Sequence, residues 1–410
     1  MVSLRRSKDT DTDAMLGDSL ALESLRINRK KYVGTIPPDW WLLFIVFSLL
    51  MIGTVMVYSA SISLGDSPRF NVDNEYFLIK HVISLVVGVI AAFVVFKVRM
   101  STWSRFSTVL FLGGILLLVL VLIPGIGKVT NGSARWIPLP FFNLQVTEVM
   151  KIATLLYVAD FTVRKQDYMH SFKKAAFPMA VAVGIVAVLV LLEPDLGALV
   201  MIVVIAASIL WLGGLNGWLF GTSILTLVAA FAAVIFTSPW RMARIFAYLD
   251  PWDATTALGK GYQLTHSLIA FGRGEAFGVG LGDAIEKQHY LPEAHTDFIL
   301  AIIGEELGFV GVIILLLLFI LLVRRCFEIG RQAIKLERFY SGLVAQGVAM
   351  WLGVQTFINV GVASGLLPTK GLTLPFVSFG GSALLSCMVA VALVYRVDYE
   401  NKLILRGGEV

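Results

Sequence analysis

The sequence predicts an all-α integral membrane protein with about ten transmembrane helices and a large extracytoplasmic loop between the seventh and eighth helices. Of its 410 residues, 57% are hydrophobic and 15% are charged, and the mean hydropathy is +0.82. Soluble domains are only about 45–50% apolar. An apolar run of about 18 residues is long enough to cross a membrane as a helix, and the chain has roughly ten such runs. The connections after the second, fourth and eighth runs are strongly basic, as expected of a multi-spanning protein.

The expected spans, in order along the chain, cover residues 40–62, 77–97, 104–124, 146–163, 175–193, 195–213, 218–237, 297–323, 341–363 and 376–396. Residues 1–39 form an N-terminal tail that is too long, too acidic and too polar to be a cleaved signal peptide. The predicted organisation continues with a ten-helix transmembrane domain over residues 40–398 and a C-terminal tail over residues 399–410.

Basic residues indicate which side of the membrane each connection faces. They cluster in the N-terminal tail, after the second, fourth and eighth spans, and at the C-terminus: Arg29, Lys30, Lys31, Lys97, Arg99, Arg164, Lys165, Arg324, Arg325, Lys402 and Arg406. Cytoplasmic connections carry an excess of Lys and Arg, so both termini are expected to be cytoplasmic. The loop at 238–296 then lies outside the cytoplasm. Its aromatic content is unlike that of a disordered linker, and loops of this length are usually functional.

Several kinds of site are not indicated. Cys326 and Cys387 fall near or within expected spans, so they suggest neither a disulfide nor a metal site. The net charge of +5 follows from basic cytoplasmic loops and gives no sign of a nucleic-acid partner. The glycine-rich part of the large loop lacks the phosphate-loop pattern, and its histidines lack the spacing of metal ligands.

Asp297 stands at the expected start of the eighth span and is the candidate catalytic residue. On a helix, five residues lie within about 40° of one line and form a stripe of small side chains below the acid: Asp297, Ala301, Gly304, Gly308 and Gly311. One interpretation is that the stripe packs against another helix while Asp297 or Thr296 caps the helix. The other is that the acid accepts a proton from a substrate hydroxyl, beside a groove for a lipid tail.

Other charged residues fall where lipid is expected. Glu148 and Lys151 are spaced i, i+3 and are expected to pair on one helical face, either for packing or for a site. Glu305 and Glu306 lie about 12–14 Å deeper than Asp297 and need partners inside the bundle, so structural pairing is the favoured role for both.

Charged residues also mark the extracytoplasmic connections. Between the fifth and sixth spans stand Glu193 and Asp195, and Asp195 is expected to cap the sixth span. The cations Arg241, Arg244 and Lys370 suit a diphosphate ligand, although basic residues at interfaces also extend to water without a chemical role. Two arginines three residues apart, on the side that disfavours them, favour function.

Six segments carry a more specific signal: NGSARWIPL at 131–139, QVTEVMKI at 145–152, EPDLG at 193–197, GYQLTHSLIAFGRG at 261–274, YLPEAHTDFILAIIGEELG at 290–308 and LLPTKGLTLPFVSFGGSALL at 366–385. Together, in this order, they resemble the SEDS family (shape, elongation, division and sporulation). The similarity covers nearly the whole chain except the tail. The residues of the PEAHTDF, IIGEELG and PTKGLTLP segments favour the division branch of the family over the elongation branch.

The resemblance implies a ten-helix glycosyltransferase of the cell inner membrane that polymerises lipid II into peptidoglycan glycan strands at the division septum. It implies that Asp297 is the essential acid and that Glu148 and Lys151 are the family's conserved pair, although Val146 replaces the usual proline. The partners implied are a class B penicillin-binding protein transpeptidase (FtsI-like) and divisome regulators (FtsQ, FtsL and FtsB-like).

Inverting transfer from an undecaprenyl diphosphate needs a base on the incoming hydroxyl and positive charge at the departing diphosphate. Our hypothesis is that Asp297 is the base. The residues expected to bind or orient the substrate are Glu148, Lys151, Arg241, Arg244, Glu293, His295 and Lys370. A divalent cation, Mg²⁺ or Mn²⁺, bound with the diphosphate could share the leaving-group role, although the sequence shows no cage for it.

Two other functions fit parts of the sequence. A lipid II flippase would also need polar residues inside the bundle, but the singular motifs cluster on one face and no inverted repeat is visible. A divisome scaffold that recruits the transpeptidase would not need an acid at the head of a groove.

Overall fold

The computed structural model describes residues 35–64, 75–130, 133–138, 143–368 and 371–409. The side chains of Thr130, Trp240, Arg241, Arg244, Ala254 and Thr255 are not described. Most of the expected N-terminal tail and the candidate Lys370 therefore lie outside the described residues.

In the described part of the chain, ten long helices overlap the ten expected spans, with the two largest differences at the eighth and tenth: the eighth helix ends at Lys335 instead of 323, and the tenth runs over Gly381–Leu405 instead of 376–396. They are α2 (Trp40–Ser61), α3 (Tyr76–Lys97), α4 (Met100–Val121), α5 (Val146–Arg164), α6 (Phe177–Leu192), α7 (Leu196–Leu212), α8 (Gly217–Phe236), α12 (Ile299–Lys335), α13 (Phe339–Ala363) and α14 (Gly381–Leu405). Eight have the length and composition to cross a membrane, α7 is a shorter apolar helix, and α5 carries four charged residues. The predicted fold class, a multi-pass membrane protein of about ten helices, is confirmed.

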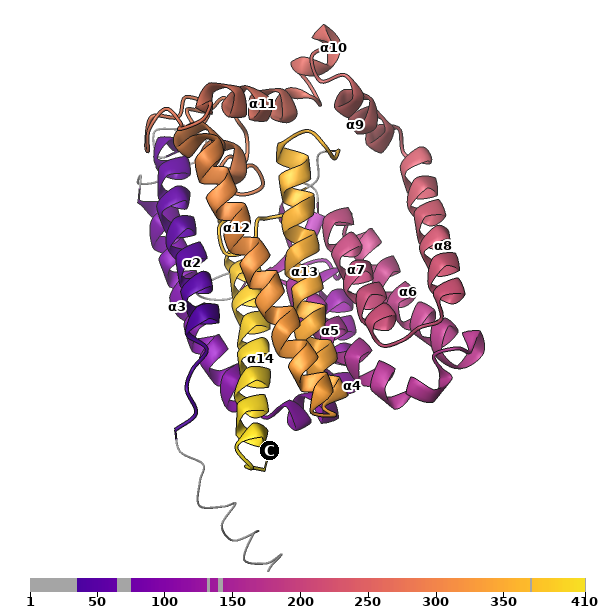
Figure 1. Ribbon diagram of the computed structural model, residues 1–410. Coiled ribbons are helices and arrows are strands. Elements are labelled where there is room, and N and C mark those ends of the chain that lie inside the picture. Colours follow the sequence, from indigo (N-terminus) through magenta and orange to yellow (C-terminus); the bar gives the residue numbers. More distant parts are fainter. Residues whose placement is uncertain (1–34, 65–74, 131–132, 139–142, 369–370, 410) are drawn as a thin grey trace, which may run out of the picture.

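The centre of the bundle is formed by α5, α13 and α14, whose residues are mostly buried. Around them, α12 packs on α13, α3 packs on α14, and α4 and α7 pack on α5. The outermost helix is α8, which stands at one edge of the molecule and has no buried residue (Figure 1). Three charged side chains of α5, those of Glu148, Lys151 and Asp160, are thus held in the protein interior, where other side chains can pair with them.

One end of the bundle carries the short helices α9 (Pro239–Leu249), α10 (Ala254–Ala257) and α11 (Tyr262–Gly274), and is called the loop end below (Figure 1). Helix α11 packs against α12. The opposite end, where α14 finishes at Leu405, is called the tail end. The short helical segments η1 (Ile62–Leu64), η2 (Gln166–Tyr168) and η3 (Phe172–Ala176) complete the helical elements.

A small antiparallel sheet, which is not among the elements predicted from the sequence, lies between α4 and α5 along the chain. Its strands, in the order β1-β2-β3, are β1 (Lys128–Thr130), β2 (Ser133–Pro138) and β3 (Asn143–Gln145). Trp136 of β2 pairs with Gln145 of β3, and the Gln145 amide donates to Ser382 Oγ at the start of α14 at 2.9 Å. The start of α5 is therefore fixed by the sheet and by α14, even though Val146 stands where proline was expected.

Helix α12 is not one straight rod. Gly308 has φ 67° and ψ −168°, so the helix is broken between residues 299–307 and 309–335. Ala301 and Gly304 are buried, and a side chain at Gly304 would collide with Phe271 of α11. The small-residue stripe thus packs against the loop end of the protein, and the prediction of a lipid-tail groove along it is wrong. The structural interpretation of the stripe is the correct one.

Candidate active site

A cavity of about 730 Å³ opens at the loop end, between the central helices and the small sheet. Its walls come from α3, the strands β1, β2 and β3, α5, the start of α7, the segment before α12, α13, the segment before α14 and the start of α14. The charged residues among its lining are Lys80, Lys128, Arg135, Glu148, Lys151, Asp195, Glu293 and Asp297. Residues that are far apart in the sequence are thus gathered around one space large enough for part of a substrate molecule.

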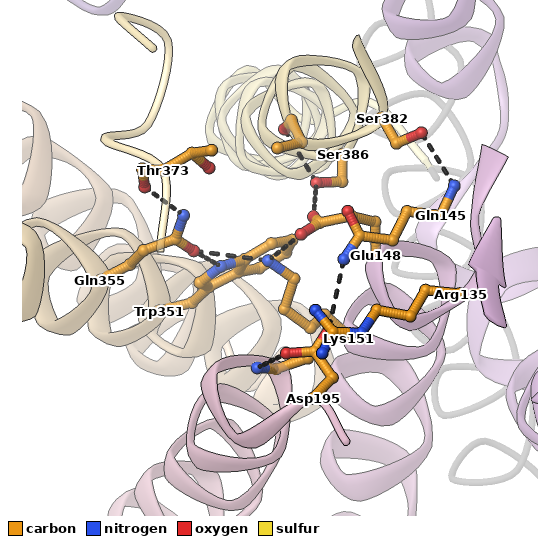
Figure 2. A network of polar contacts seen from close by, with 12 residues as sticks. Arg135, Gln145, Glu148, Lys151, Asp195, Trp351, Gln355, Thr373, Ser382 and Ser386 are labelled. Atoms are coloured by element: carbon orange, nitrogen blue, oxygen red, sulfur yellow. Dashed lines mark hydrogen bonds and ion pairs between the residues drawn. The ribbon is translucent and has the colours of Figure 1, made fainter. Parts of the chain in front are cut away.

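The expected pair on α5 forms in the wall of this cavity. Lys151 Nζ lies 2.8 Å from Glu148 Oε1, and the lysine side chain is 1% exposed. Lys151 Nζ is also 3.4 Å from Gln355 Oε1 and 4.9 Å from the centre of the Trp351 ring, both on α13. Ser386 of α14 donates to the other oxygen of Glu148 (Figure 2). The pair therefore ties three helices together, as the packing interpretation expects, and it also lines the cavity, while its role in a site stays a prediction.

Asp195 caps α7 as expected, since its Oδ1 accepts from the Ala198 amide at 3.0 Å. Its second oxygen lies 3.3 Å from Gln145 Nε2 and 4.0 Å from an NH of Arg135 (Figure 2). Arg135 also donates to the backbone carbonyls of Glu193 and Pro194, at 2.9 and 2.7 Å. The arginine of β2 therefore holds the turn before α7 and helps keep Asp195 at the cavity.

The Glu193 carboxyl, in contrast, lies outside the lining of the cavity. It is 1% exposed, and neither oxygen has a hydrogen-bond partner among the described residues. Burial first, and the neighbouring Asp195 second, raise the pKa of this carboxyl to about 8, against the opposing effect of Arg135. Glu193 is therefore mostly neutral at pH 7 and adds little negative charge to the site.

Asp297 lies at the cavity, immediately before α12. The helix begins at Ile299, and no described side chain caps it, so the capping interpretation of Asp297 or Thr296 is wrong. Asn359 of α13 donates to the Asp297 carbonyl at 3.0 Å, which fixes the backbone. A Cβ at Gly371 would lie 2.9 Å from Asp297 Oδ2, so glycine allows the close approach of this segment.

The environment of Asp297 favours the protonated form. Burial is the main cause, and the negative charges of Glu293 and Asp195 add to it, so the pKa of Asp297 is raised to about 7. A general base is most effective when its pKa is near the working pH. The carboxyl group thus combines a position at the cavity with a pKa suited to accepting a proton near neutral pH.

Glu293 and His295, the other candidates in this segment, lie in different surroundings. Glu293 lines the cavity and accepts from Thr296 Oγ1 at 2.8 Å. His295 is buried and is not part of the lining: its ring centre lies 4.8 Å from that of Phe77 and 5.6 Å from that of Phe379. Burial lowers the pKa of His295, so the ring is neutral at pH 7. The structure gives His295 a packing position behind the cavity wall.

The remaining candidates are not tested. Arg241 and Arg244 belong to α9, but their side chains are outside the described set, as is Lys370. The cations that do line the cavity beside Lys151 are Lys80, Lys128 and Arg135. These three were not among the candidates from the sequence, although Arg135 stands in the NGSARWIPL segment and Lys80 lies near the start of the second expected span.

Within the described residues, no group of three or more His, Cys, Asp or Glu side chains is placed to hold a metal ion. The carboxylates of Asp195 and Asp297 nevertheless line the same cavity and are oxygen ligands of the kind that Mg²⁺ and Mn²⁺ prefer. A divalent cation that enters with a diphosphate would find these two side chains, and this expectation stays a prediction.

Comparisons with known proteins agree on one family. The family model of FtsW, RodA and SpoVE, described as "Cell cycle protein", matches residues 40–403. A protein of Burkholderia thailandensis named "Probable peptidoglycan glycosyltransferase FtsW" is 58% identical over 91% of this chain and 81% of its own length. A protein of the same name from Polynucleobacter necessarius is 52% identical over 91% of this chain and 88% of its own length.

Solved structures share the fold. One chain, from a structure described as "Structural coordination of polymerization and crosslinking by a peptidoglycan synthase complex", is 27% identical with a TM-score of 0.71 and covers 90% of this chain and 99% of its own. The rod shape determining protein RodA of Thermus thermophilus is 26% identical with a TM-score of 0.64 over the same shares. The similarity extends over almost the whole described bundle.

Proposed function

The chain belongs to the FtsW, RodA and SpoVE family of cell cycle proteins, and from this premise we propose that it is a peptidoglycan glycosyltransferase that polymerises lipid II with Asp297 as base. Three relatives that are 52–58% identical over 90–91% of this chain carry the glycosyltransferase name. The observation that carries the finer proposal is the cavity at the loop end, which holds Asp297 together with four cationic side chains.

The proposed reaction uses the two kinds of charge in this cavity. The acceptor sugar presents its 4-hydroxyl to Asp297, which takes the proton as the oxygen bonds to the anomeric carbon of the growing chain. The bond from that carbon to the diphosphate breaks at the same time, and its electron pair leaves with the undecaprenyl diphosphate. Attack opposite the departing group inverts the configuration, and no covalent enzyme intermediate is needed.

Positive charge stabilises the departing diphosphate because negative charge develops on its bridging oxygen in the transition state. Lys151, Arg135, Lys128 and Lys80 line the cavity and are proposed to supply it. Glu148 fixes Lys151 through the 2.8 Å ion pair, so the ammonium group is held before the substrate arrives. Arg241, Arg244 and Lys370 remain proposed diphosphate ligands, and Glu293 a proposed substrate ligand.

We further propose that the loop end faces away from the cytoplasm and that both termini are cytoplasmic, because basic residues are concentrated at the tail end. The site would then act on lipid II at the outer face of the inner membrane, at the division septum. A crosslinking transpeptidase of the FtsI type is the proposed partner, since one similar chain belongs to a peptidoglycan synthase complex. Regulators of the FtsQ, FtsL and FtsB type are proposed from the family alone.

The test is polymerisation of labelled lipid II by the purified chain with its crosslinking partner in detergent. In detergent there are no two sides of a membrane between which a flippase could move lipid II. Neither a flippase nor a scaffold forms a glycosidic bond, so neither yields glycan in this assay. We expect glycan strands from the unaltered chain and none from Asp297→Ala. The absence of product from the unaltered chain, where a known polymerase is active, would refute the enzyme, and normal product from Asp297→Ala would refute the base.

A further inference from the structure

The break in α12 is filled by another part of the chain. In an unbroken helix, the amides of Phe309 and Val310 would donate to the carbonyls of Glu305 and Glu306. Here these amides donate instead to the carbonyls of Glu275 and Ala276, at 2.9 and 3.1 Å. The two carbonyls they leave free accept from the amides of Val279 and Gly280, at 2.9 and 3.1 Å. The segment 275–280 is thus inserted into the helix, and each of these displaced backbone groups has a new partner.

Two glycines make this insertion possible. Gly308 and Gly278 both have positive φ values, 67° and 84°. A Cβ on Gly308 would lie 2.3 Å from the Gly278 amide nitrogen, and a Cβ on Gly278 would lie 2.0 Å from the Glu306 carbonyl oxygen. The break is therefore specified by the sequence on both sides of the contact.

The half-helix 299–307 is held a second time by its own carboxylates. Glu305 accepts from the amides of Ile285 and Glu286 at 2.9 and 3.2 Å, and it lies 3.4 Å from the Arg273 guanidinium. Glu306 Oε1 accepts from Lys287 Nζ and from Ser59 Oγ of α2, both at 2.6 Å.

Lys287 is bound in turn to α2 and its extension. Its Nζ donates to Ser59 Oγ at 2.9 Å, and its carbonyl accepts from Ser63 Oγ of η1 at 2.6 Å. Both Lys287 and Glu306 are buried. The segment 275–287 therefore holds the half-helix against α2 and α11, and these contacts are called the clamp below.

Asp297 is attached to the other end of this half-helix, two residues before Ile299. We propose that Lys287, Glu306, Arg273 and Glu305 are positioning residues, which fix the half-helix 299–307 through the inserted segment 275–287 and thereby hold Asp297 at the cavity. This inference rests on the proposed role of Asp297 as base. An error of 1 Å in the placement of a catalytic group can cost about 100-fold in rate, so a loosened clamp should lower kcat without changing KM.

Two variants test the clamp, and the first of them leaves no stranded charge. Lys287→Met/Glu306→Leu replaces the buried ion pair by apolar side chains of similar volume, a change that buried pairs often tolerate. Arg273→Gln removes one cation, while Glu305 keeps its two backbone donors, and Arg273→Lys is the conservative rescue. The matched control is Arg324→Gln, which breaks an ion pair with Glu328 on the same helix beyond the Gly308 break.

The readouts are hydrogen exchange of the backbone amides and steady-state polymerisation of lipid II by the chain with its crosslinking partner. We expect faster exchange confined to residues 275–307 and a fall in kcat of about 10- to 100-fold in the double variant, with KM for lipid II unchanged. Arg273→Gln should give a smaller fall that Arg273→Lys restores. Arg324→Gln should match the unaltered chain.

Wild-type kcat in the folded variants, or exchange in 299–307 that does not change, would overturn the clamp. If the double variant does not fold, Arg273→Gln alone decides: an unaltered kcat rejects the proposal. The failure of the proposed function can be told apart from the failure of the clamp. If the unaltered chain makes no glycan, the proposed function is refuted. Faster exchange of residues 299–307 in the variants would then still support the clamp, because hydrogen exchange does not depend on activity.

Discussion

Removal of Lys151 is expected to damage both the stability and the activity of the protein, for reasons that can be separated. Lys151→Met leaves Glu148 in the interior without its cation, which stood 2.8 Å away. Breaking a buried ion pair by removing one partner costs about 3–5 kcal/mol. The double variant Glu148→Gln/Lys151→Met removes the stranded charge, so most of this stability should return. In that variant, Ser386 can still donate to the amide oxygen of the introduced glutamine.

Activity should behave differently from stability in this series. If Lys151 supplies positive charge to the departing diphosphate, its loss costs about 10²–10³ in kcat, and neutralising Glu148 does not replace the charge. The double variant should therefore be stable but still slow. The assay combines thermal unfolding in detergent with lipid II polymerisation. The control is Arg324→Met on α12, whose 2.9 Å pair with Glu328 joins two side chains that are both at least 31% exposed and should matter by less than about 1 kcal/mol.

A double variant that regains wild-type kcat would show that the pair serves only packing, and the proposed role of Lys151 at the diphosphate would be refuted. Unfolding of Lys151→Met at the same temperature as the unaltered chain would refute the energetic argument instead, because it would mean that the buried Glu148 side chain loses little stability without its cation.

Three further predictions concern the cavity. The pKa of Asp297 is raised to about 7, and a base works in its deprotonated form, so kcat/KM should fall as the pH drops below 7. The residual rate of Asp297→Asn should not show this fall. If the pH profile of that variant were unchanged, the fall would have to come from another group. Gly371→Ala places a methyl group 2.9 Å from Asp297 Oδ2 and should lower kcat by at least about 10-fold without loss of fold, with wild-type kcat as the contrary result. Asp195→Ala removes a helix cap worth about 1 kcal/mol, whereas Asp195→Asn keeps a capping oxygen. Thermal unfolding should therefore show that the alanine variant is less stable than the asparagine variant. Equal stabilities would argue that the cap contributes nothing.

Local chemistry in the sequence is a good guide where the interaction itself is local. The i, i+3 spacing of Glu148 and Lys151 predicts their ion pair, and the position of Asp195 before an apolar run predicts its capping role. The deep location of Glu305 and Glu306 predicts that both acids need partners, but that Arg273 and Lys287 supply them follows from long-range packing. For the ion pair and the cap, a few neighbouring residues contain the physical reason.

Long-range packing explains what the sequence did not reveal. The periodicity of residues 297–311 predicts one continuous helix. The break at Gly308 depends on hydrogen bonds with residues 275–280, and the pattern of residues within the helix cannot predict those bonds. His295 shares a segment with Asp297, yet the rings of Phe77 and Phe379 hold it behind the wall. Arg135 becomes a site residue only because the small sheet places it over the turn before α7.

The central claim is that Asp297 accepts the proton of the incoming hydroxyl. Its most direct test is single-turnover polymerisation by Asp297→Asn, which keeps the size and shape of the side chain, together with a measurement of lipid II binding. We expect the rate of the chemical step to fall by about 10²–10⁴-fold while binding and thermal unfolding stay as in the unaltered chain. Polymerisation at the wild-type rate by a folded Asp297→Asn protein would contradict the claim.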